Sequence, residues 1–336
     1  MVLIAVHLGA GSYSNRENDA ALVRLLNSAV DAGLHCFSNG GNAETAACAV
    51  VAELEKSPLV NAGFGSNLTK TGIVECDAGV ARVRPGQDKV ASFGAVGAAP
   101  GLESPVAVAL EVLREAEEGL RLIPSMSAMR LVAGKEAWVW AKERNLPAAP
   151  NETDFAEFYV TPRARGSWTS ARDKLETFHR DSKRPRCDDT VGCICVADDE
   201  SMAVAVSSGG PVMRSNGRVG PAAVFGMGFY ASDRVAVCAT GSSDFISRHL
   251  LSRSAADGPQ IIIPERNTYD DVGIMRISRT GVDDELSLQW AFTSPGLALA
   301  YSWNDIRVSK VMRQDRSESS TTDRVNQGSV SFRYGR

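Results

Sequence analysis

The chain has no apolar run of about 18 residues, the length that a membrane-spanning helix needs. Its first residues lack the charged segment and the small-residue cleavage site of a signal peptide, so no export signal is expected there. Basic residues are not in excess, because 36 lysines and arginines stand against 40 aspartates and glutamates. We therefore expect neither a membrane segment nor a nucleic-acid partner.

Cysteine is scarce and scattered. The seven cysteines show no paired Cys-x-x-Cys spacing, which argues against zinc and against a disulfide framework and favours a reducing compartment. A tight glycine turn is expected at residues 7–12, but the Lys-Ser/Thr pair of a phosphate-binding loop does not follow it. These patterns predict no metal site and no cofactor.

The 336 residues, 44% of them hydrophobic, suffice for one large domain or two small ones. Apolar spacing predicts helices at 19–32, 42–56, 105–118 and 125–144 and strands at 2–6, 191–197, 202–207, 236–240, 273–278 and 286–292. The polar, charged stretch 169–189 reads as a flexible linker, and the Ser/Thr-rich, charged residues 309–336 read as a disordered tail.

A short basic run, Lys183–Arg186, lies inside the expected linker. Exposed lysine and arginine clusters are read as nuclear localisation signals, although a run this short is more often only a solvated surface. Together with the cysteine pattern, it predicts a protein of the cytoplasm, the nucleus or both.

Thr190 is the candidate nucleophile. It follows an acidic pair and opens an apolar, β-branched run at the end of the linker, where a cut of the chain is tolerated. A threonine hydroxyl needs a base, and a cut before Thr190 would supply its own α-amine, with a pKa of about 7.7 to 8.0. The alternative is that Thr190 only begins a buried strand.

Six motifs, in this order, resemble the type 2 asparaginase family of N-terminal nucleophile hydrolases. The motifs read HLGAG (7–11), NAGFGS (61–66), DTVG (189–192), SSGG (207–210), GRVG (217–220) and TG (240–241), and the resemblance runs from about residue 4 to 303. The resemblance implies an α+β fold, a four-layer αββα sandwich, made as a precursor that cleaves itself between Asp189 and Thr190. Residues 1–189 would become the α subunit and 190–308 the β subunit of one domain, and two processed units are expected to form a homodimer.

The resemblance also implies roles in catalysis. Ser208 stands where the family places a hydroxyl that bonds the threonine and its amine. Thr240 and Gly241 match the oxyanion hole, where donors stabilise the charge that develops on the substrate oxygen. Arg218 matches the arginine that binds a substrate carboxylate.

A loop near the nucleophile completes the implied site. Asn61 lies in this loop, whose backbone holds the site in shape. Some relatives hold a sodium ion with the corresponding backbone carbonyls, so a structural ion is a candidate for residues 58–69. No other cofactor is implied.

Two departures from the family pattern concern the substrate pocket, which we expect Gly220, Pro221 and Ser243 to line with Arg218. In asparaginases the residue after the Gly-Arg-Val-Gly run is an aspartate that binds the α-amino group of the substrate, and here it is Pro221. The second glycine of the later Thr-Gly-x-Gly-Glu run is replaced by Ser243, followed by Asp244. Free asparagine is therefore expected to lose its ammonium anchor.

An aspartyl residue within a peptide presents its carboxylate at the same distance from the scissile carbonyl but needs no counter-ion at position 221. Arg218 can bind either carboxylate, ideally with two parallel hydrogen bonds. The sequence thus predicts a threonine endopeptidase that cuts an Asp-containing protein or peptide after aspartate. Within the family, the chain looks most like the threonine aspartase (taspase) branch. During self-cleavage Asp189 is expected to occupy the same carboxylate pocket.

Two alternatives remain open at this stage. One is an asparaginase or isoaspartyl peptidase that hydrolyses a β-aspartyl amide with an unusual anchor. The other is a non-catalytic relative retained for binding or assembly, whose chain would stay uncut.

Overall fold

The computed structural model describes residues 2–11, 13, 16–86, 91–122, 128–176, 189–266, 270–280, 285–314 and 325–333. Strands within these ranges form two sheets. The larger sheet has, in spatial order, β12 (Ile306–Arg313), β11 (Gly296–Trp303), β1 (Leu3–Gly11), β5 (Val191–Val196), β6 (Met202–Ser208), β2 (Glu75–Val83), β3 (Ser92–Pro100) and β4 (Leu131–Ala133). The smaller has β13 (Asn326–Phe332), β10 (Leu286–Phe292), β9 (Val272–Arg279), β8 (Val235–Gly241) and β7 (Phe229–Ala231).

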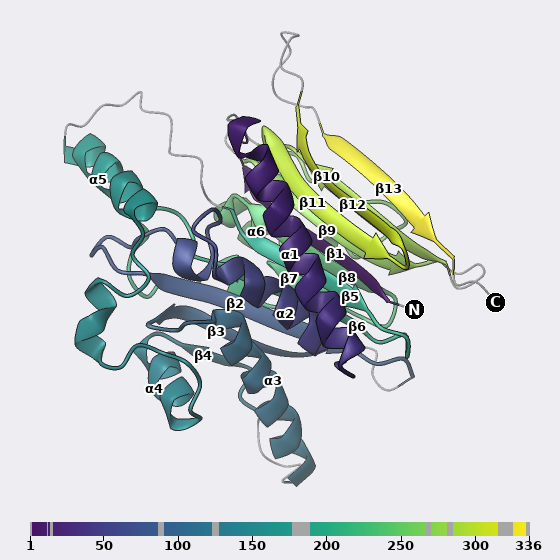
Figure 1. Cartoon of the computed structure of the whole chain (residues 1–336), viewed down its shortest axis with the longest axis horizontal. Coiled ribbons are helices and arrows are strands. Elements are labelled where there is room, and N and C mark those ends of the chain that lie inside the picture. The colour runs from purple at the N-terminus through teal and green to yellow at the C-terminus, as the bar shows by residue number, and fades with distance from the viewer. Residues whose placement is uncertain are drawn as a thin grey trace.

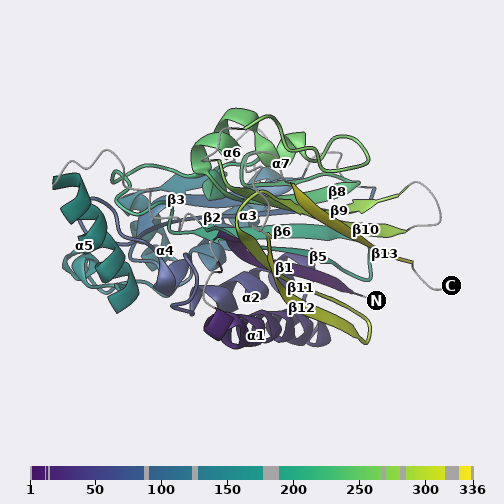
Figure 2. The same cartoon turned by 90° about the horizontal axis from the view of Figure 1, so that it is seen from above.

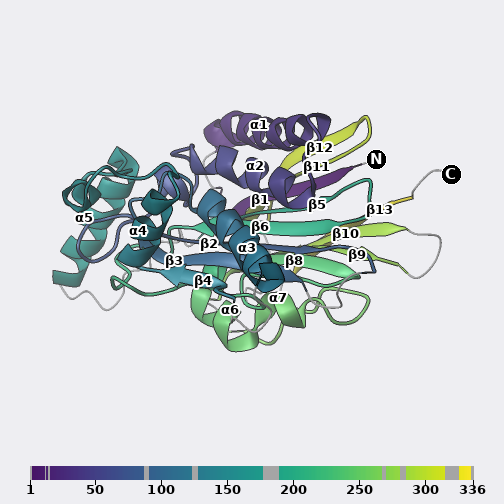
Figure 3. The same ribbon diagram turned by 90° about the horizontal axis from the view of Figure 1, so that it is seen from below.

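Helices cover the outer face of each sheet. Figures 2 and 3 show α1 and α2 on one side of the stacked sheets and α6 and α7 on the other, while Figure 1 shows α4 and α5 at the end of the molecule away from both termini. The helix bounds are α1 (Asp19–Ser38), α2 (Ala43–Glu55), α3 (Pro105–Leu122), α4 (Lys135–Glu143), α5 (Pro162–Glu176), α6 (Ser243–His249) and α7 (Leu251–Ser254). This is the four-layer αββα sandwich that the sequence predicts.

The layers follow from the side-chain alternation of the strands. In β1, Ile4 and Val6 pack toward α1 and α2, whereas Leu3 and Ala5 point to the smaller sheet. Every residue of β1 is buried, because one face meets helices and the other meets a sheet. Burying an aliphatic side chain of this size contributes about 1.5–3 kcal/mol, so the double-faced core supplies much of the folding free energy.

The start of α2 shows how local sequence sets an element. The Asn42 side chain accepts a hydrogen bond from the Thr45 backbone N–H at 3.1 Å, and Thr45 Oγ1 accepts one from the Asn42 N–H at 2.9 Å. This reciprocal cap satisfies two backbone donors that the helix itself leaves unpaired. The predicted helices at 19–32, 42–56 and 105–118 and the hairpin of 191–197 with 202–207 are confirmed.

Two local predictions are wrong. Residues 7–11 are not a turn but the continuation of β1, with a bulge between His7 and Ala10. The expected helix 125–144 is interrupted, since β4 (Leu131–Ala133) pairs parallel with β3 and Gly134, at φ +64°, precedes α4. In both cases pairing with a distant strand overrides the local pattern.

The linker and the tail also differ from expectation. Helix α5 extends to residue 176 and so occupies the first part of the expected linker. Residues 177–188, with the Lys183–Arg186 run, lie outside the described residues. The expected disordered tail contains most of β12 and all of β13, which are sheet-edge strands with many polar, partly exposed residues; Phe332 of β13 is buried against Trp303. Edge strands need only one apolar face, so their sequence resembles a polar tail.

No helix within the described ranges is both long enough and apolar enough to cross a membrane.

Candidate active site

Thr190 lies at the seam between the two sheets. It immediately precedes β5, and the antiparallel register that pairs Val191 with Ser207 puts Thr190 opposite Ser208. Its side chain is buried, and its backbone N–H donates a hydrogen bond of 2.9 Å to Oγ1 of Thr240, at the end of β8. The same oxygen accepts a 3.2 Å hydrogen bond from the N–H of Ala10. Three strands from two sheets therefore meet at the bond before Thr190.

A narrow pocket opens beside Thr190. Its lining includes the four residues that the sequence predicts for substrate binding, which are Arg218, Gly220, Pro221 and Ser243. The other lining residues are Asp77, Thr190, Ser208, Gly210, Ala222, Gly241 and Ile246. The cavity volume is about 10 Å³, which is room for about one water molecule. In the uncut chain the pocket is thus assembled but too small for a substrate.

Ser208 lines this pocket, but its hydroxyl has another partner. Oγ of Ser208 accepts a hydrogen bond of 3.1 Å from the N–H of Gly210. Among the described contacts, Ser208 makes no hydrogen bond with Thr190. The predicted hydrogen bonds of Ser208 to the hydroxyl and the amine of Thr190 would therefore require a different arrangement of these two residues.

Gly241, the last residue of β8, lines the pocket just before α6 begins. Its φ is +112°, and a methyl group at this position would lie 2.1 Å from the carbonyl oxygen of Asp271. Only glycine combines this backbone conformation with such a close neighbour. Gly241 and Thr240 are thus held beside the nucleophile, as expected for an oxyanion hole, although Thr240 bonds the scissile nitrogen here.

Arg218 presents a guanidinium to the pocket. Within the described part of the chain, its Nη1 is buried and has no hydrogen-bond partner. A buried cationic donor without a partner is costly, and a carboxylate is its natural complement. Three apolar residues, Pro221, Ala222 and Ile246, also line the pocket.

One acidic side chain does line the pocket, and it is already neutralised. Asp77 pairs with Nη1 of Arg214 at 2.5 Å, with both side chains almost fully buried, and it accepts a 2.7 Å hydrogen bond from the N–H of Ala98. Its Oδ2 would lie 2.7 Å from a methyl group at Gly220. Arg214 and Ile246 were not predicted as site residues; a lone arginine in a glycine-rich stretch was the only cue for the first, and nothing marked the second.

Asn61 does not line the pocket but ties its loop in place. Its Nδ2 donates to the carbonyl oxygen of Gly210 at 2.9 Å, and its Oδ1 accepts from the N–H of Asn67 at 2.8 Å. Its carbonyl oxygen also accepts from the N–H of Gly209 at 2.9 Å. Asn61 therefore fixes the turn that follows Ser208 and acts as a positioning residue.

The loop expected to hold an ion contains a cation from the chain itself. Nε of Arg163 donates to the carbonyl oxygen of Pro58 at 3.1 Å, and its Nη2 donates to those of Val60 and Gly65. Three carbonyls of the 58–69 loop thus converge on one guanidinium. Nowhere in the described ranges do three or more His, Cys, Asp or Glu side chains form a cluster suited to a metal.

Asp189 lies elsewhere than predicted. Its side chain packs on β1, where a methyl group at Gly9 would lie 2.4 Å from its Cβ, and it is not among the residues that line the pocket. The structure therefore places the Asp189 side chain on β1, outside the Arg218 pocket that it is expected to occupy during self-cleavage.

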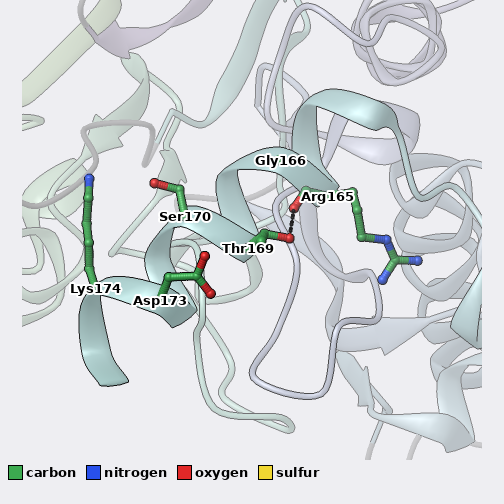
Figure 4. A pocket seen from close by; sticks show the side chains of 6 residues that line it. All are labelled: Arg165, Gly166, Thr169, Ser170, Asp173 and Lys174. Atoms are coloured by element: carbon green, nitrogen blue, oxygen red, sulfur yellow. Dashed lines mark hydrogen bonds between the residues drawn. The ribbon is translucent and has the colours of Figure 1, made fainter. Parts of the chain in front are cut away.

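A larger open depression of about 640 Å³ lies on α5, away from Thr190 (Figure 4). All six lining residues belong to this one helix: Arg165, Gly166, Thr169, Ser170, Asp173 and Lys174. Because no second element within the described ranges contributes a lining residue, the described part of this depression shows no converging side chains of the kind that form a catalytic site.

Comparison with known proteins agrees with this geometry. A family model described as Asparaginase matches residues 1–258. The chain is 31% identical over 256 residues to an isoaspartyl peptidase/L-asparaginase of Xenopus laevis, covering 75% of this chain and 74% of the relative. It is 31% identical over 259 residues to a plant-type L-asparaginase of Pyrobaculum calidifontis, covering 76% and 79%. An isoaspartyl peptidase/L-asparaginase of Rattus norvegicus is 29% identical over 255 residues, covering 76% and 70%.

Proposed function

This chain belongs to the type 2 asparaginase family of N-terminal nucleophile hydrolases, and from that premise we propose that it is an autoprocessing threonine endopeptidase that cleaves proteins or peptides after aspartate. Hydrolases of this family need no cofactor, so the chemistry falls to the protein's own groups. Thr190 is the nucleophile, and Arg218 binds the aspartate side chain of the substrate.

Self-cleavage creates the active enzyme. The hydroxyl oxygen of Thr190 bonds to the carbonyl carbon of Asp189, and the carbon–nitrogen bond breaks. The proton of the hydroxyl is transferred to the departing nitrogen. Asp189 is then an ester on Thr190. Water hydrolyses this ester, which restores the hydroxyl, releases the new carboxylate of Asp189 and leaves Thr190 with a free α-amine.

In the mature enzyme this α-amine takes the hydroxyl proton as Thr190 attacks the main-chain carbonyl carbon of the substrate aspartate. Thr240 and Gly241 stabilise the negative charge on the carbonyl oxygen. The scissile carbon–nitrogen bond then breaks, and the leaving amine receives the proton. Water hydrolyses the acyl-enzyme and returns Thr190 to its starting state.

The observation that carries the specificity is the charge distribution of the pocket. Arg218 offers one cationic donor without a partner, whereas Asp77, the one acidic residue of the lining, is neutralised by Arg214. Pro221 and Ile246 supply apolar surface where an ammonium group would need a counter-ion. A carboxylate without a neighbouring ammonium, as in an aspartyl residue of a peptide, is the better complement to this pocket.

A second candidate is favoured by the comparisons. The relatives are named isoaspartyl peptidase/L-asparaginase or plant-type L-asparaginase, which suggests hydrolysis of a β-aspartyl amide. Such an enzyme would need an ammonium anchor other than residue 221.

We also propose that two processed units form a homodimer in the cytoplasm or nucleus, which light scattering of the purified protein and microscopy of a tagged chain would check.

The first experiment is N-terminal sequencing of the purified protein together with its Thr190→Ala variant. We expect a new chain that begins at Thr190 in the wild type and a single uncut chain in the variant. A variant that still splits refutes the nucleophile, and a folded wild type that stays whole indicates a non-catalytic relative. Mature enzyme is then incubated with asparagine, a β-aspartyl dipeptide and an Asp-containing peptide; ammonia release from asparagine would overturn the endopeptidase proposal.

A further inference from the structure

The side chain before the scissile bond and the arginine of the pocket occupy separate places. Asp189 packs on β1, whereas Arg218 lines the pocket with a buried Nη1 that has no hydrogen-bond partner in the described structure. Both residues carry charges that would attract each other in a shared site. Their separation indicates that the uncut chain holds Asp189 by other means.

The backbone of β1 makes room for Asp189 through two missing side chains, and we call Gly9, Ala10 and Gly11 the glycine seat. A methyl group at Gly11 would lie 2.6 Å from both carboxylate oxygens of Asp189, and one at Gly9 would lie 2.4 Å from its Cβ. Neither a carbon nor an oxygen atom can lie this close to a methyl group, so a side chain at either glycine would displace Asp189. The middle residue, Ala10, directs its N–H to Thr240, the residue that also bonds the nitrogen of Thr190.

We propose that self-cleavage and substrate cleavage use different sites for the aspartate side chain. Asp189 of the precursor is positioned by the glycine seat, and the aspartate of a substrate is bound by Arg218. This inference rests on the self-cleavage in the proposed function and specifies which residues select aspartate at each stage. Gly9 and Gly11 are then positioning residues for maturation, and Arg218 is a specificity residue for turnover only.

Gly11 permits a clean steric test. Its φ lies outside the left-handed region, so alanine can adopt this backbone, whereas Gly9, at φ +120°, would be strained by any side chain. Alanine at position 11 therefore acts through its contact with Asp189. Replacing Asp189 with alanine removes the carboxylate that the new methyl group would meet.

The first experiment measures the seat without any cleavage, in the uncut Thr190→Ala chain. We expect Gly11→Ala to lower the melting temperature by about 3–6 °C. Adding Asp189→Ala should restore most of this loss. Gly119→Ala on α3 is the control for a methyl group that meets nothing within 4 Å, and it should keep or raise the melting temperature, because alanine favours a helix over glycine. Equal losses with and without Asp189→Ala would overturn the proposal.

The second experiment compares maturation with turnover in chains that keep Thr190. We expect Gly11→Ala to slow self-cleavage by on the order of tenfold to a hundredfold, as a misplaced scissile bond does. Arg218→Gln should self-cleave within about twofold of the wild-type rate and lose about tenfold to a hundredfold in kcat/KM on an Asp-containing peptide. If Arg218→Gln slows self-cleavage as much as Gly11→Ala does, the two sites are one and the proposal fails.

The test of the glycine seat does not depend on whether the proposed substrate is correct. If the mature wild type does not cut the Asp-containing peptide but hydrolyses asparagine, the endopeptidase assignment fails. The melting temperatures and self-cleavage rates still test the glycine seat, because neither measurement involves an added substrate.

Discussion

The backbone nitrogen of Thr190, which immediately precedes β5 of the larger sheet, lies 2.9 Å from Oγ1 of Thr240 in β8 of the smaller sheet. That single oxygen also accepts the N–H of Ala10, so it joins β1, β5 and β8 at the bond that the proposed self-cleavage would break. Under the proposed function, the sheet interface is part of the reaction site. A loss of this oxygen should affect both stability and maturation.

Replacing Thr240 with valine keeps the shape of the side chain and removes the shared acceptor. Two buried N–H groups then lose a partner, which should cost about 1–3 kcal/mol in the free energy of unfolding. We expect slower self-cleavage, measured as the fraction of cut chain against time on denaturing gels. Thr240→Ser retains the hydroxyl and should keep most of the wild-type rate; a fast valine variant would contradict a role for this oxygen.

Pro221→Asp should restore the missing ammonium anchor. A carboxylate at this position can bind the α-amino group of asparagine while Arg218 binds its carboxylate, so we expect asparagine hydrolysis to rise by about tenfold or more. Ammonia release is the measurement. Pro221→Asn is the matched control, because it has the same size without the charge. Equal ammonia release from both variants would show that charge at 221 does not set the substrate.

The contacts of Arg163 lead us to expect that the stability and activity of the protein do not depend on monovalent cations. Its guanidinium already engages three carbonyls of the 58–69 loop, so melting temperature and peptide turnover should be the same in sodium chloride and choline chloride of equal concentration. Arg163→Ala should cost about 2–3 kcal/mol in unfolding free energy. Arg165→Ala, which removes an ion pair to the exposed Glu157, should change it by less than about 1 kcal/mol. A sodium requirement in the wild type would contradict this role for Arg163.

Glu55 predicts a pH dependence of stability. Burial raises the pKa of its carboxyl from 4.5 to about 7, despite hydrogen bonds from the hydroxyls of Ser104 and Ser207, both at 2.6 Å. Between these values the folded chain keeps a proton that the unfolded chain has lost. Stability therefore falls as pH rises from 4.5 to about 7, by about 3 kcal/mol, and levels off above.

The measurement is the difference in unfolding free energy between the Thr190→Ala chain and the same chain with Glu55→Gln, from pH 4.5 to 8. Glutamine carries the donor of a protonated carboxyl at all these pH values. A difference is needed because burial lowers the pKa of His7 to about 3, which makes stability rise with pH up to about 6.5 and so opposes the effect of Glu55. A constant difference would show that Glu55 is ionised throughout.

The sequence by itself determined the nucleophile candidate and the family motifs, and the resemblance carried by those motifs implied the four layers. Thr190 stands at a change from polar to β-branched residues, and several of the strands and helices have clear periodicities. Prediction from the sequence failed where the local pattern of apolar residues is weak. The edge strands β12 and β13 are predicted as a polar tail. Residues 7–11 are predicted as a turn because of their glycines, but Gly9 and Gly11 lie in a strand and leave room for the side chain of Asp189.

Only the tertiary structure decided which charges meet. Asp77 and Arg214 are 137 positions apart in the sequence, and their ion pair depends on how β2 and the segment after β6 are placed. Arg163 reaches the 58–69 loop from the start of α5, and Asp189 reaches Gly11 rather than Arg218. Such contacts follow from strand register and layer packing, which bring distant residues together without a mark in the sequence near either partner.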